Sequence, residues 1–239
     1  MTIELRDVTK RVRLGSVRVT YEGLNIRVES NSRVAFLGNQ QAGLEALVKL
    51  ICAADAPDRG VVTRTNSISW PIPDSKFLSK HLTLAANARF IARLYEVDEE
   101  SYLEKLAEIA QPGDFMNVRG DACPKDVLSR FCFSAGICLP FDHYILTGVS
   151  AGSKEDRARF APIVEELGQR AGILLVTSDV KAAKQVCEQA FVFDDGRATF
   201  FDNMEAAAEF YGGLASPGDG EEDFFDSDPE LESLVNMDF

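Results

Sequence analysis

The sequence contains few of the side chains that commonly bind metals or act in catalysis. Its 239 residues include two histidines and five cysteines, and no two cysteines have CxxC spacing. Scattered cysteines without such spacing favour neither a disulfide framework nor a zinc site. We therefore expect reduced, buried cysteines and no bound metal. The histidines, His81 and His143, are expected at the surface or against a partner, not as a catalytic pair.

Long apolar runs and an excess of basic residues are absent as well. The longest unbroken apolar stretches, such as that at 172–176, are about five residues long, whereas a membrane-spanning helix needs about 20. Residues 1–13 carry interleaved charges where a secretory signal would need a hydrophobic core. We expect a cytoplasmic protein without direct membrane insertion. The sequence shows no basic face of the kind that binds nucleic acid.

Negative charge is concentrated at the C-terminal end. The formal net charge is −13, and nine of the 38 acids lie in residues 217–239, which contain no Lys or Arg. Residues 1–216 hold 29 acids against 25 bases and are nearly neutral. We expect a folded domain over 1–214, followed by an acidic, flexible tail over 215–239.

Hydrophobic periodicity predicts a strand-rich beginning. Residues 3–14 and 17–29 alternate apolar and polar side chains, as antiparallel strands do, with turns expected at Gly15 and at Glu22-Gly23. An apolar strand at 32–37, a glycine loop at 38–43 and a helix at 44–54 follow. This order is typical of a phosphate-binding site.

The rest of the domain alternates helices with short apolar strands. Helical spacing at 82–95, 99–110 and 127–138 predicts a helical subdomain over about 73–137. Further elements are expected as strands at 143–146 and 173–177, helices at 154–171, 181–189 and 204–211, and a hairpin over 190–201. Together they predict an α/β fold with a mainly parallel sheet and an antiparallel N-terminal flank.

Several strings resemble, in the same order, the ATP-binding subunits of ABC transporters, most closely those that export capsular and related cell-surface polysaccharides. The strings are IELRDVTKRVRLG at 3–15, ALVKLICAADAPDRGVV at 46–62, SWPI at 69–72, ANARFIARLYEVD at 86–98, FDHYIL at 141–146 and DDGRATFFDNMEAAAEFY at 194–211. The resemblance covers residues 1–211 and implies the ABC-type P-loop NTPase fold. It implies ancestry, not activity.

The phosphate loop of that family reads like GxxGAGKST, where backbone amides cradle the phosphates, the lysine neutralises them and the serine holds magnesium. The aligned string at 38–46 is GNQQAGLEA. Gly38 and Gly43 are kept, Gln41 replaces a glycine, Leu44 stands at the lysine position and Glu45 at the serine position. Because an aliphatic group cannot neutralise phosphate and a carboxylate repels it, the usual ATP binding should be lost.

The other motifs implied by the resemblance are replaced too. Thr147 and Gly148 stand where the family has an Asp for magnesium and a Glu for the attacking water, and Ser178 stands at the switch histidine. Phe77 lies where a metal-contacting Gln is usual, and CPKDV at 123–127 replaces the signature segment. Asp142 precedes its strand and so lies at the wrong end to substitute for the missing acids. Because residues in six separate segments are changed, a site that no longer works explains the changes better than drift or misalignment does.

Misalignment cannot restore the phosphate-loop lysine. The one basic residue in 38–54 is Lys49, which falls well inside the expected helix as a solvated charge. The leading hypothesis is therefore a catalytically inactive ABC-ATPase-like subunit, without cofactor, that serves as scaffold or regulator in cell-surface polysaccharide export or assembly. The alternatives are a divergent but active ATP-binding subunit of such an exporter, and a soluble interaction module unrelated to transport.

The expected partners are an ABC transmembrane subunit, an active ABC ATPase relative or a second copy, at a peripheral site on the inner membrane. In the family a cytoplasmic helix of the transmembrane subunit docks in a groove that residues 70–93 would cover here. Trp70 and Phe77 are thus candidate partner contacts, with simple packing as the alternative for Trp70. Phe224 and Phe225 in the acidic tail would suit a basic, partly apolar partner, unless the tail is merely solubilising.

Overall fold

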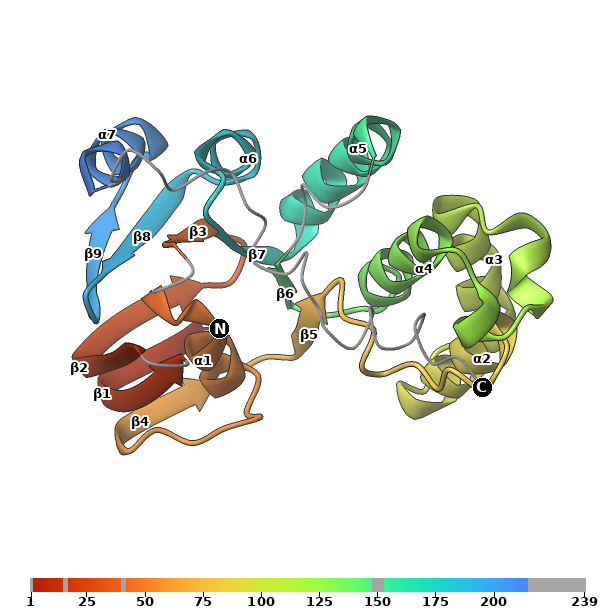
Figure 1. The fold of residues 1–239 in the computed structure, drawn as a ribbon, viewed down its shortest axis with the longest axis horizontal. Coiled ribbons are helices and arrows are strands. Elements are labelled where there is room, and N and C mark those ends of the chain that lie inside the picture. Colours follow the sequence, from red (N-terminus) through yellow and green to blue (C-terminus); the bar gives the residue numbers. More distant parts are fainter. Residues whose placement is uncertain (1, 15–16, 40–41, 148–152, 215–239) are drawn as a thin grey trace. The chain divides into compact units, whose positions relative to one another are not determined.

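The structure is a computed structural model that describes residues 2–14, 17–39, 42–147 and 153–214. These residues form two compact units, each of which can be followed in Figure 1. The first unit comprises the described parts of Met1–Pro71, Phe141–Ser150 and Phe160–Asp226. The second comprises the described parts of Ile72–Pro140 and Ala151–Arg159.

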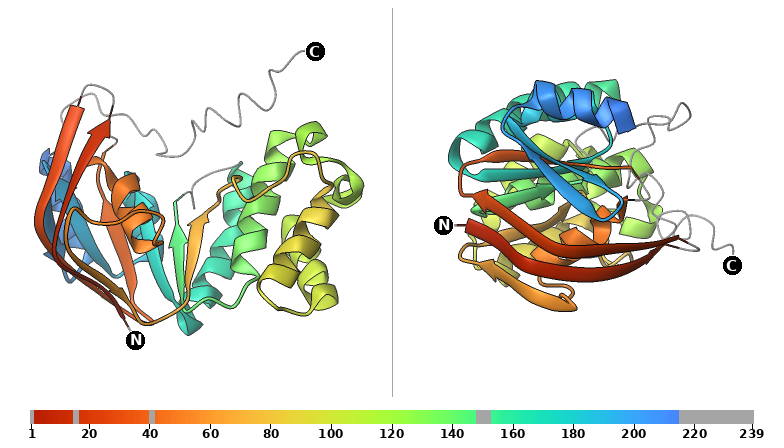
Figure 2. Two further views of the ribbon diagram at one scale, coloured as in Figure 1. Left: turned by 90° about the horizontal axis from the view of Figure 1, so that it is seen from below. Right: turned by 90° about the vertical axis from the view of Figure 1, so that its left-hand side faces the viewer.

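A three-stranded antiparallel sheet begins the first unit, in the order β2-β1-β4. Its strands are β1 (Thr2–Leu14), β2 (Val17–Glu29) and β4 (Arg59–Arg64). Figure 2 shows β1 and β2 as a long curved pair beside the first helix. The predicted antiparallel flank is confirmed, but the turn predicted at Glu22-Gly23 is wrong. Glu22 and Gly23 instead lie inside β2, at a point where the pairing of β2 with β1 shifts register. Gly23 there has a φ of 61°.

A six-stranded sheet has the order β5-β6-β7-β3-β8-β9. Its parallel centre confirms the predicted α/β architecture, and the antiparallel pair β8–β9 closes around Asp195 and Gly196. Both turn residues have positive φ, 42° and 74°, which suits a two-residue hairpin turn. The strands are β3 (Arg33–Leu37), β5 (Ile68–Ile72), β6 (His143–Leu146), β7 (Gly172–Thr177), β8 (Gln189–Asp194) and β9 (Arg197–Phe201).

Helix α1 (Leu44–Ile51) packs into the core of the first unit. Its buried side chains join those of β1, β2 and β3 in one hydrophobic cluster. Helices α6 (Val180–Val186) and α7 (Met204–Leu214) complete this unit, and α5 (Lys154–Arg170) follows Ser153 along the chain. Along the sequence, the glycine loop at 38–43 connects the buried strand β3 to the buried helix α1.

The second unit is built on helices α2 (Leu84–Leu94), α3 (Glu99–Ala110) and α4 (Lys125–Ile137). Short 3-10 helices at Gly113–Asn117 and Gly120–Ala122 separate α3 from α4. Thr83 and Asp98 cap α2 and α3 through their side chains. The Tyr102 hydroxyl donates to the carbonyl oxygen of Ala135, 2.8 Å away, and joins α3 to α4. None of the helices within the described ranges is both long enough and apolar enough to cross a membrane.

Candidate functional site

Three neighbouring strand ends bring the predicted nucleotide positions to one edge of the parallel sheet. Leu37 of β3 pairs with Thr177 of β7, and Leu146 of β6 pairs with Leu175. The residues that follow these strands are Gly38, Ser178 and Thr147. Because parallel strands end at a common edge, which is where α/β sheets bind ligands, these three positions lie at one edge of the sheet, and their role in a nucleotide site stays a prediction.

The two ends of the glycine loop, Gly38–Asn39 and Ala42–Gly43, are described by the structure. Gly43 caps α1 in the left-handed conformation, with φ 71° and ψ 28°, which a residue with a Cβ adopts at a cost. The amide of Gly38 donates to the carbonyl oxygen of Thr177, and that of Ala42 donates to Asn39. Gln41 lies outside the described residues. The backbone at this helix N-terminus is therefore compatible with an anion site.

Leu44, at the lysine position, belongs to the hydrophobic core. Its side chain has no exposed surface and lies in one cluster with Phe36, Leu47 and Tyr21. Gly38 lies close to this side chain, since a Cβ built on Gly38 would lie 3.1 Å from the Cδ1 atom of Leu44. Burying a leucine side chain contributes about 1.5–3 kcal/mol to stability. The position thus serves packing and supplies no positive charge.

A tyrosine that sequence reasoning missed holds the loop. Tyr21 of β2 is fully buried, and its hydroxyl donates to the carbonyl oxygen of Ala42. Burial raises the pKa of Tyr21, so that it is a neutral donor. Its ring meets Phe193 edge to face, with centroids 6.2 Å apart. The available signal was a tyrosine at an inward strand position, because a buried hydroxyl needs a polar partner.

Glu45, at the serine position, turns along the helix. Its carboxylate pairs with the Nζ of Lys49 at 2.6 Å, one turn further on, and both side chains are about half exposed. The prediction that Lys49 is a solvated helix charge is confirmed. A carboxylate in the first turn suits the positive end of the helix dipole. Glu45 therefore offers no hydroxyl to hold magnesium, and its own charge is paired with Lys49.

The positions of the missing acids and switch histidine carry small neutral side chains. Thr147 is buried, Ser178 is half-buried, and Gly148 lies outside the described residues. Asp142 lies before β6, at the opposite end of the strand, and its Oδ2 accepts from the amide and hydroxyl of Ser67. These hydrogen bonds lower the pKa of Asp142. It serves as a structural cap, which agrees with its predicted exclusion from the site.

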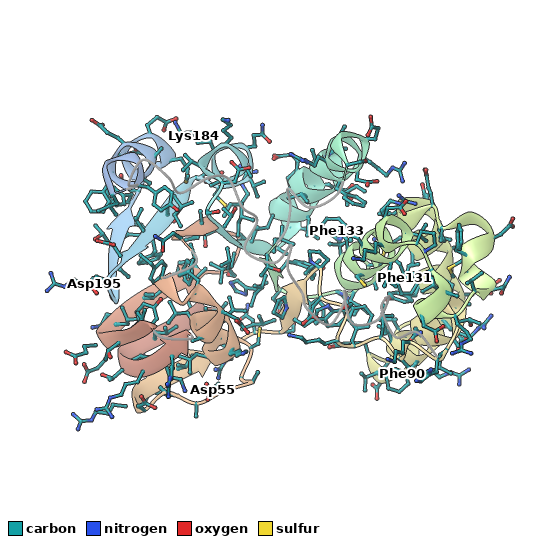
Figure 3. The ribbon with its side chains drawn as sticks, viewed as in Figure 1. Asp55, Phe90, Phe131, Phe133, Lys184 and Asp195 are labelled. Atoms are coloured by element: carbon teal, nitrogen blue, oxygen red, sulfur yellow. The ribbon has the colours of Figure 1, made fainter. Side chains whose placement is uncertain are left out.

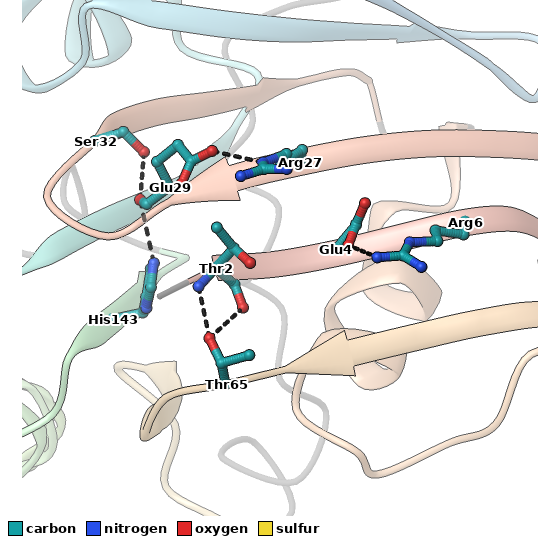
Figure 4. A network of polar contacts seen from close by, with 8 residues as sticks. All are labelled: Thr2, Glu4, Arg6, Arg27, Glu29, Ser32, Thr65 and His143. Atoms are coloured by element: carbon teal, nitrogen blue, oxygen red, sulfur yellow. Dashed lines mark hydrogen bonds and ion pairs between the residues drawn. The ribbon is translucent and has the colours of Figure 1, made fainter.

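The prediction for His143 is wrong. The side chain is fully buried, and its Nε2 lies 3.3 Å from the carbonyl oxygen of Glu29, as Figure 4 shows. Gly172 on the neighbouring strand makes the room, since a Cβ there would lie 2.6 Å from His143 Cδ2. His81 is exposed, as predicted, 3.6 Å from an Asp121 oxygen. No cluster of metal-ligating side chains occurs in the part of the chain that the structure describes.

The four residues predicted to contact a partner differ in the part of the structure to which they belong. Trp70 is half-buried in the first unit, where its ring meets Phe141 edge to face with centroids 5.8 Å apart. Phe77 is half-buried in the second unit. Phe224 and Phe225 lie outside the described residues.

The similarity to known ATP-binding proteins of polysaccharide export extends over nearly the whole chain. No protein-family model matches the chain. The polysialic acid transport ATP-binding protein KpsT of Escherichia coli is 28% identical over 214 residues, which cover 87% of this chain and 96% of KpsT. The capsule polysaccharide export ATP-binding protein CtrD of Neisseria meningitidis serogroup B is 29% identical over 217 residues, or 89% and 99% of the two chains. The ATP-binding protein BexA of Haemophilus influenzae is 26% identical over 211 residues, or 87% and 97%.

Solved structures establish the fold. A dimeric ATP-binding cassette with ADP and Pi superposes with a TM-score of 0.71 at 15% identity, covering 83% of this chain and 98% of the cassette. The ATP-binding subunit of an ABC transporter gives 0.72 at 19% identity, covering 90% and 96%. The chain has the ABC-ATPase fold, and the relatives described above are ATP-binding proteins, of which KpsT is named for polysialic acid transport and CtrD for capsule polysaccharide export.

Proposed function

We propose that this chain is a catalytically inactive ABC-ATPase-like subunit that acts as a scaffold or regulator in cell-surface polysaccharide export or assembly. Its similarity to ATP-binding proteins of polysialic acid transport and of capsule polysaccharide export supports a role in such a transport system. The main support for the proposed loss of ATP binding and hydrolysis is the complete burial of Leu44 in the hydrophobic core. No cofactor is part of the proposal.

Electrostatics argues against a bound triphosphate at this loop. The family's lysine would attract the phosphates, whereas Leu44 supplies no charge. Glu45 is exposed in the first turn of α1 and would repel them. Because Lys49 pairs with this carboxylate and both side chains are about half exposed, solvent screens the repulsion, and the absence of the lysine is the larger effect. Thr147 and Ser178 carry no charge to hold magnesium or activate water.

Two surfaces remain for assembly. One is the sheet edge around Gly38, Thr147 and Ser178, through which a second copy or an active ABC ATPase would pair. Direct protein contacts would hold such a pair, without nucleotide. The other is the segment 70–93 with Trp70 and Phe77, which would contact an ABC transmembrane subunit. The subunit would then be cytoplasmic and peripheral at the inner membrane.

A pull-down from native membranes tests the scaffold role. The full chain, immobilised by a tag, is expected to retain an ABC transmembrane subunit in buffer that contains EDTA and no nucleotide. Trp70→Ala with Phe77→Ala should reduce that recovery, while Phe200→Ala, at an exposed position of the first unit, should not. Recovery of soluble proteins alone would contradict the scaffold role and favour an interaction module outside transport.

A divergent, active ATPase is the second candidate, because Gly43 keeps its left-handed conformation and the homologues are ATP-binding proteins. An active enzyme would show ATP turnover that disappears in Gly43→Val, which distorts the loop. We expect no turnover above background in either protein. A partner's residues could complete such a site, so the assay is repeated on the complex recovered from membranes.

A further inference from the structure

The three-stranded sheet of the first unit is basic, although the chain as a whole is acidic. Strands β1, β2 and β4 together contain eight Lys and Arg residues and four Asp and Glu residues, a balance of +4. Residues 1–216 hold 25 bases and 29 acids in all, so the rest of that range keeps 17 bases and 25 acids. Positive charge is therefore concentrated in three strands that lie side by side only once they pair.

Five arginines of these strands share the outer face of the sheet. Apart from the bulges, alternate side chains of β1 and β2 pack into the hydrophobic core, so the residues between them face away from it. In register, Glu4 lies opposite Arg27, and Arg6 lies opposite Val61. Arg59 lies opposite Thr9, which is two residues before Arg11. We call this surface the arginine face, and its exposed arginines are Arg6, Arg11, Arg13, Arg27 and Arg59.

Two arginines of the arginine face hold a glutamate of their own strand. The guanidinium of Arg6 lies 2.6 Å from a carboxylate oxygen of Glu4, and Nε of Arg27 lies 2.5 Å from one of Glu29, as Figure 4 shows. Because a guanidinium has five N–H donors, each of these arginines can bind a further anionic oxygen. The other three arginines add positive charge, so the face as a whole attracts anions.

Lys10 and Arg64 of the same strands serve the interior of the first unit instead. The Nζ of Lys10 lies 2.7 Å from a carboxylate oxygen of Asp55, which Figure 3 labels. The Nε of Arg64 donates to the carbonyl oxygen of Ile51 at the end of α1, 2.6 Å away. Asp58, which accepts from a backbone amide of β1, is an acid at the border of the arginine face. The face therefore depends on its arginines.

The chemistry of the arginine face fits a surface that carries many phosphate groups. Arginine binds phosphate through two parallel N–H···O bonds, and here the arginines are spread over three strands. Val61, which is 58% exposed, adds an apolar contact among them. Single-stranded nucleic acid is bound through aromatic rings as well as positive charge. The one aromatic residue in the three strands, Tyr21, is buried, which favours a lipid surface over nucleic acid.

We propose that the arginine face binds the anionic headgroups of a phospholipid membrane. Attraction between exposed charges reaches about 10 Å at 0.1 M salt, so acids further away in the chain oppose it little. The uneven distribution of charge also turns this face toward an anionic surface. The inference rests on the proposed peripheral position at the membrane and not on the loss of ATP binding, so vesicle binding and ATP calorimetry can fail separately.

Flotation of the purified full chain with lipid vesicles tests the proposal. Vesicles of phosphatidylcholine with phosphatidylglycerol should bind the chain, pure phosphatidylcholine should not, and added salt should release it. Replacing three arginines of the face together, by Arg11→Gln, Arg13→Gln and Arg59→Gln, should weaken binding about tenfold or more, because each arginine near an anionic membrane strengthens it. The matched control Arg89→Gln, Arg93→Gln and Arg157→Gln removes the same charge at exposed positions outside the sheet and should bind as the wild type does.

A lysine variant guards against a change in the fold. Arg11→Lys, Arg13→Lys and Arg59→Lys together keep the charge and should keep most of the binding. Equal binding to both kinds of vesicle, or equal weakening in the glutamine, lysine and control variants, would overturn the proposal. Tighter binding of single-stranded RNA than of the anionic vesicles, lost in the glutamine variant of the face, would assign the arginine face to nucleic acid and overturn the lipid assignment.

Discussion

The Tyr21 hydroxyl donates a hydrogen bond to the carbonyl oxygen of Ala42, and thereby joins strand β2 to the glycine loop ahead of α1. Leu44 lies two residues further, in the same core cluster as Tyr21. The C-terminal end of the loop, at Ala42 and Gly43, is therefore held by contacts with the interior of the first unit.

Tyr21→Phe should destabilise the chain by about 1–3 kcal/mol, because the buried carbonyl of Ala42 loses its donor while the ring is kept. Urea unfolding of the wild type and the variant measures the change. Val61→Thr, at an exposed position, is the control and should change stability by less than about 0.5 kcal/mol. Equal midpoints for all three proteins would contradict the role given to Tyr21.

Leu44→Lys should lower the free energy of unfolding by about 3–5 kcal/mol, the range for an unpaired buried charge. The reason is that the side chain occupies a fully buried site. Leu44→Met, with similar volume and no charge, should cost less than about 1.5 kcal/mol. Denaturant midpoints compare the three proteins. A lysine variant as stable as the wild type would show that the position faces solvent.

Acid should weaken the fold through His143. Burial lowers its pKa below the ordinary value of 6.5, so the folded chain binds this proton less readily than the unfolded chain. The contribution is fully present above pH 6.5, and the free energy of unfolding falls as the pH drops below that value. Urea titrations between pH 7.5 and pH 5 measure the slope. His143→Gln should flatten it, and an unchanged slope would contradict the assignment.

Much of the fold could be predicted from periodicity and turn chemistry. Helix α3 and strand β6 have the predicted bounds, since their apolar spacing is regular and their ends carry clear signals. Strands β4 and β5 were missed. Their side chains are mostly exposed or half-buried, so that neither strand has a distinct buried face. Glu22-Gly23 looked like a turn because a bulge and a turn both use a glycine with positive φ.

The candidate site could be located from the sequence but not described in full. Positions such as Gly38 and Ser178 directly follow neighbouring parallel strands, and the pairing of these strands brings them to one edge. The bond of Tyr21 joins residues that lie far apart along the sequence. The burial of His143 depends on the space beside Gly172 on another strand. Such pairings arise from tertiary packing, which local periodicity does not encode.

Isothermal titration calorimetry with ATP and magnesium tests the central claim most directly. The polysialic acid transport ATP-binding protein KpsT of E. coli serves as the positive control under the same conditions. We predict no saturable heat for this chain up to millimolar nucleotide, because Leu44 supplies no cation and Glu45 adds an anion at the loop. Saturable, magnesium-dependent binding with micromolar affinity would contradict the account.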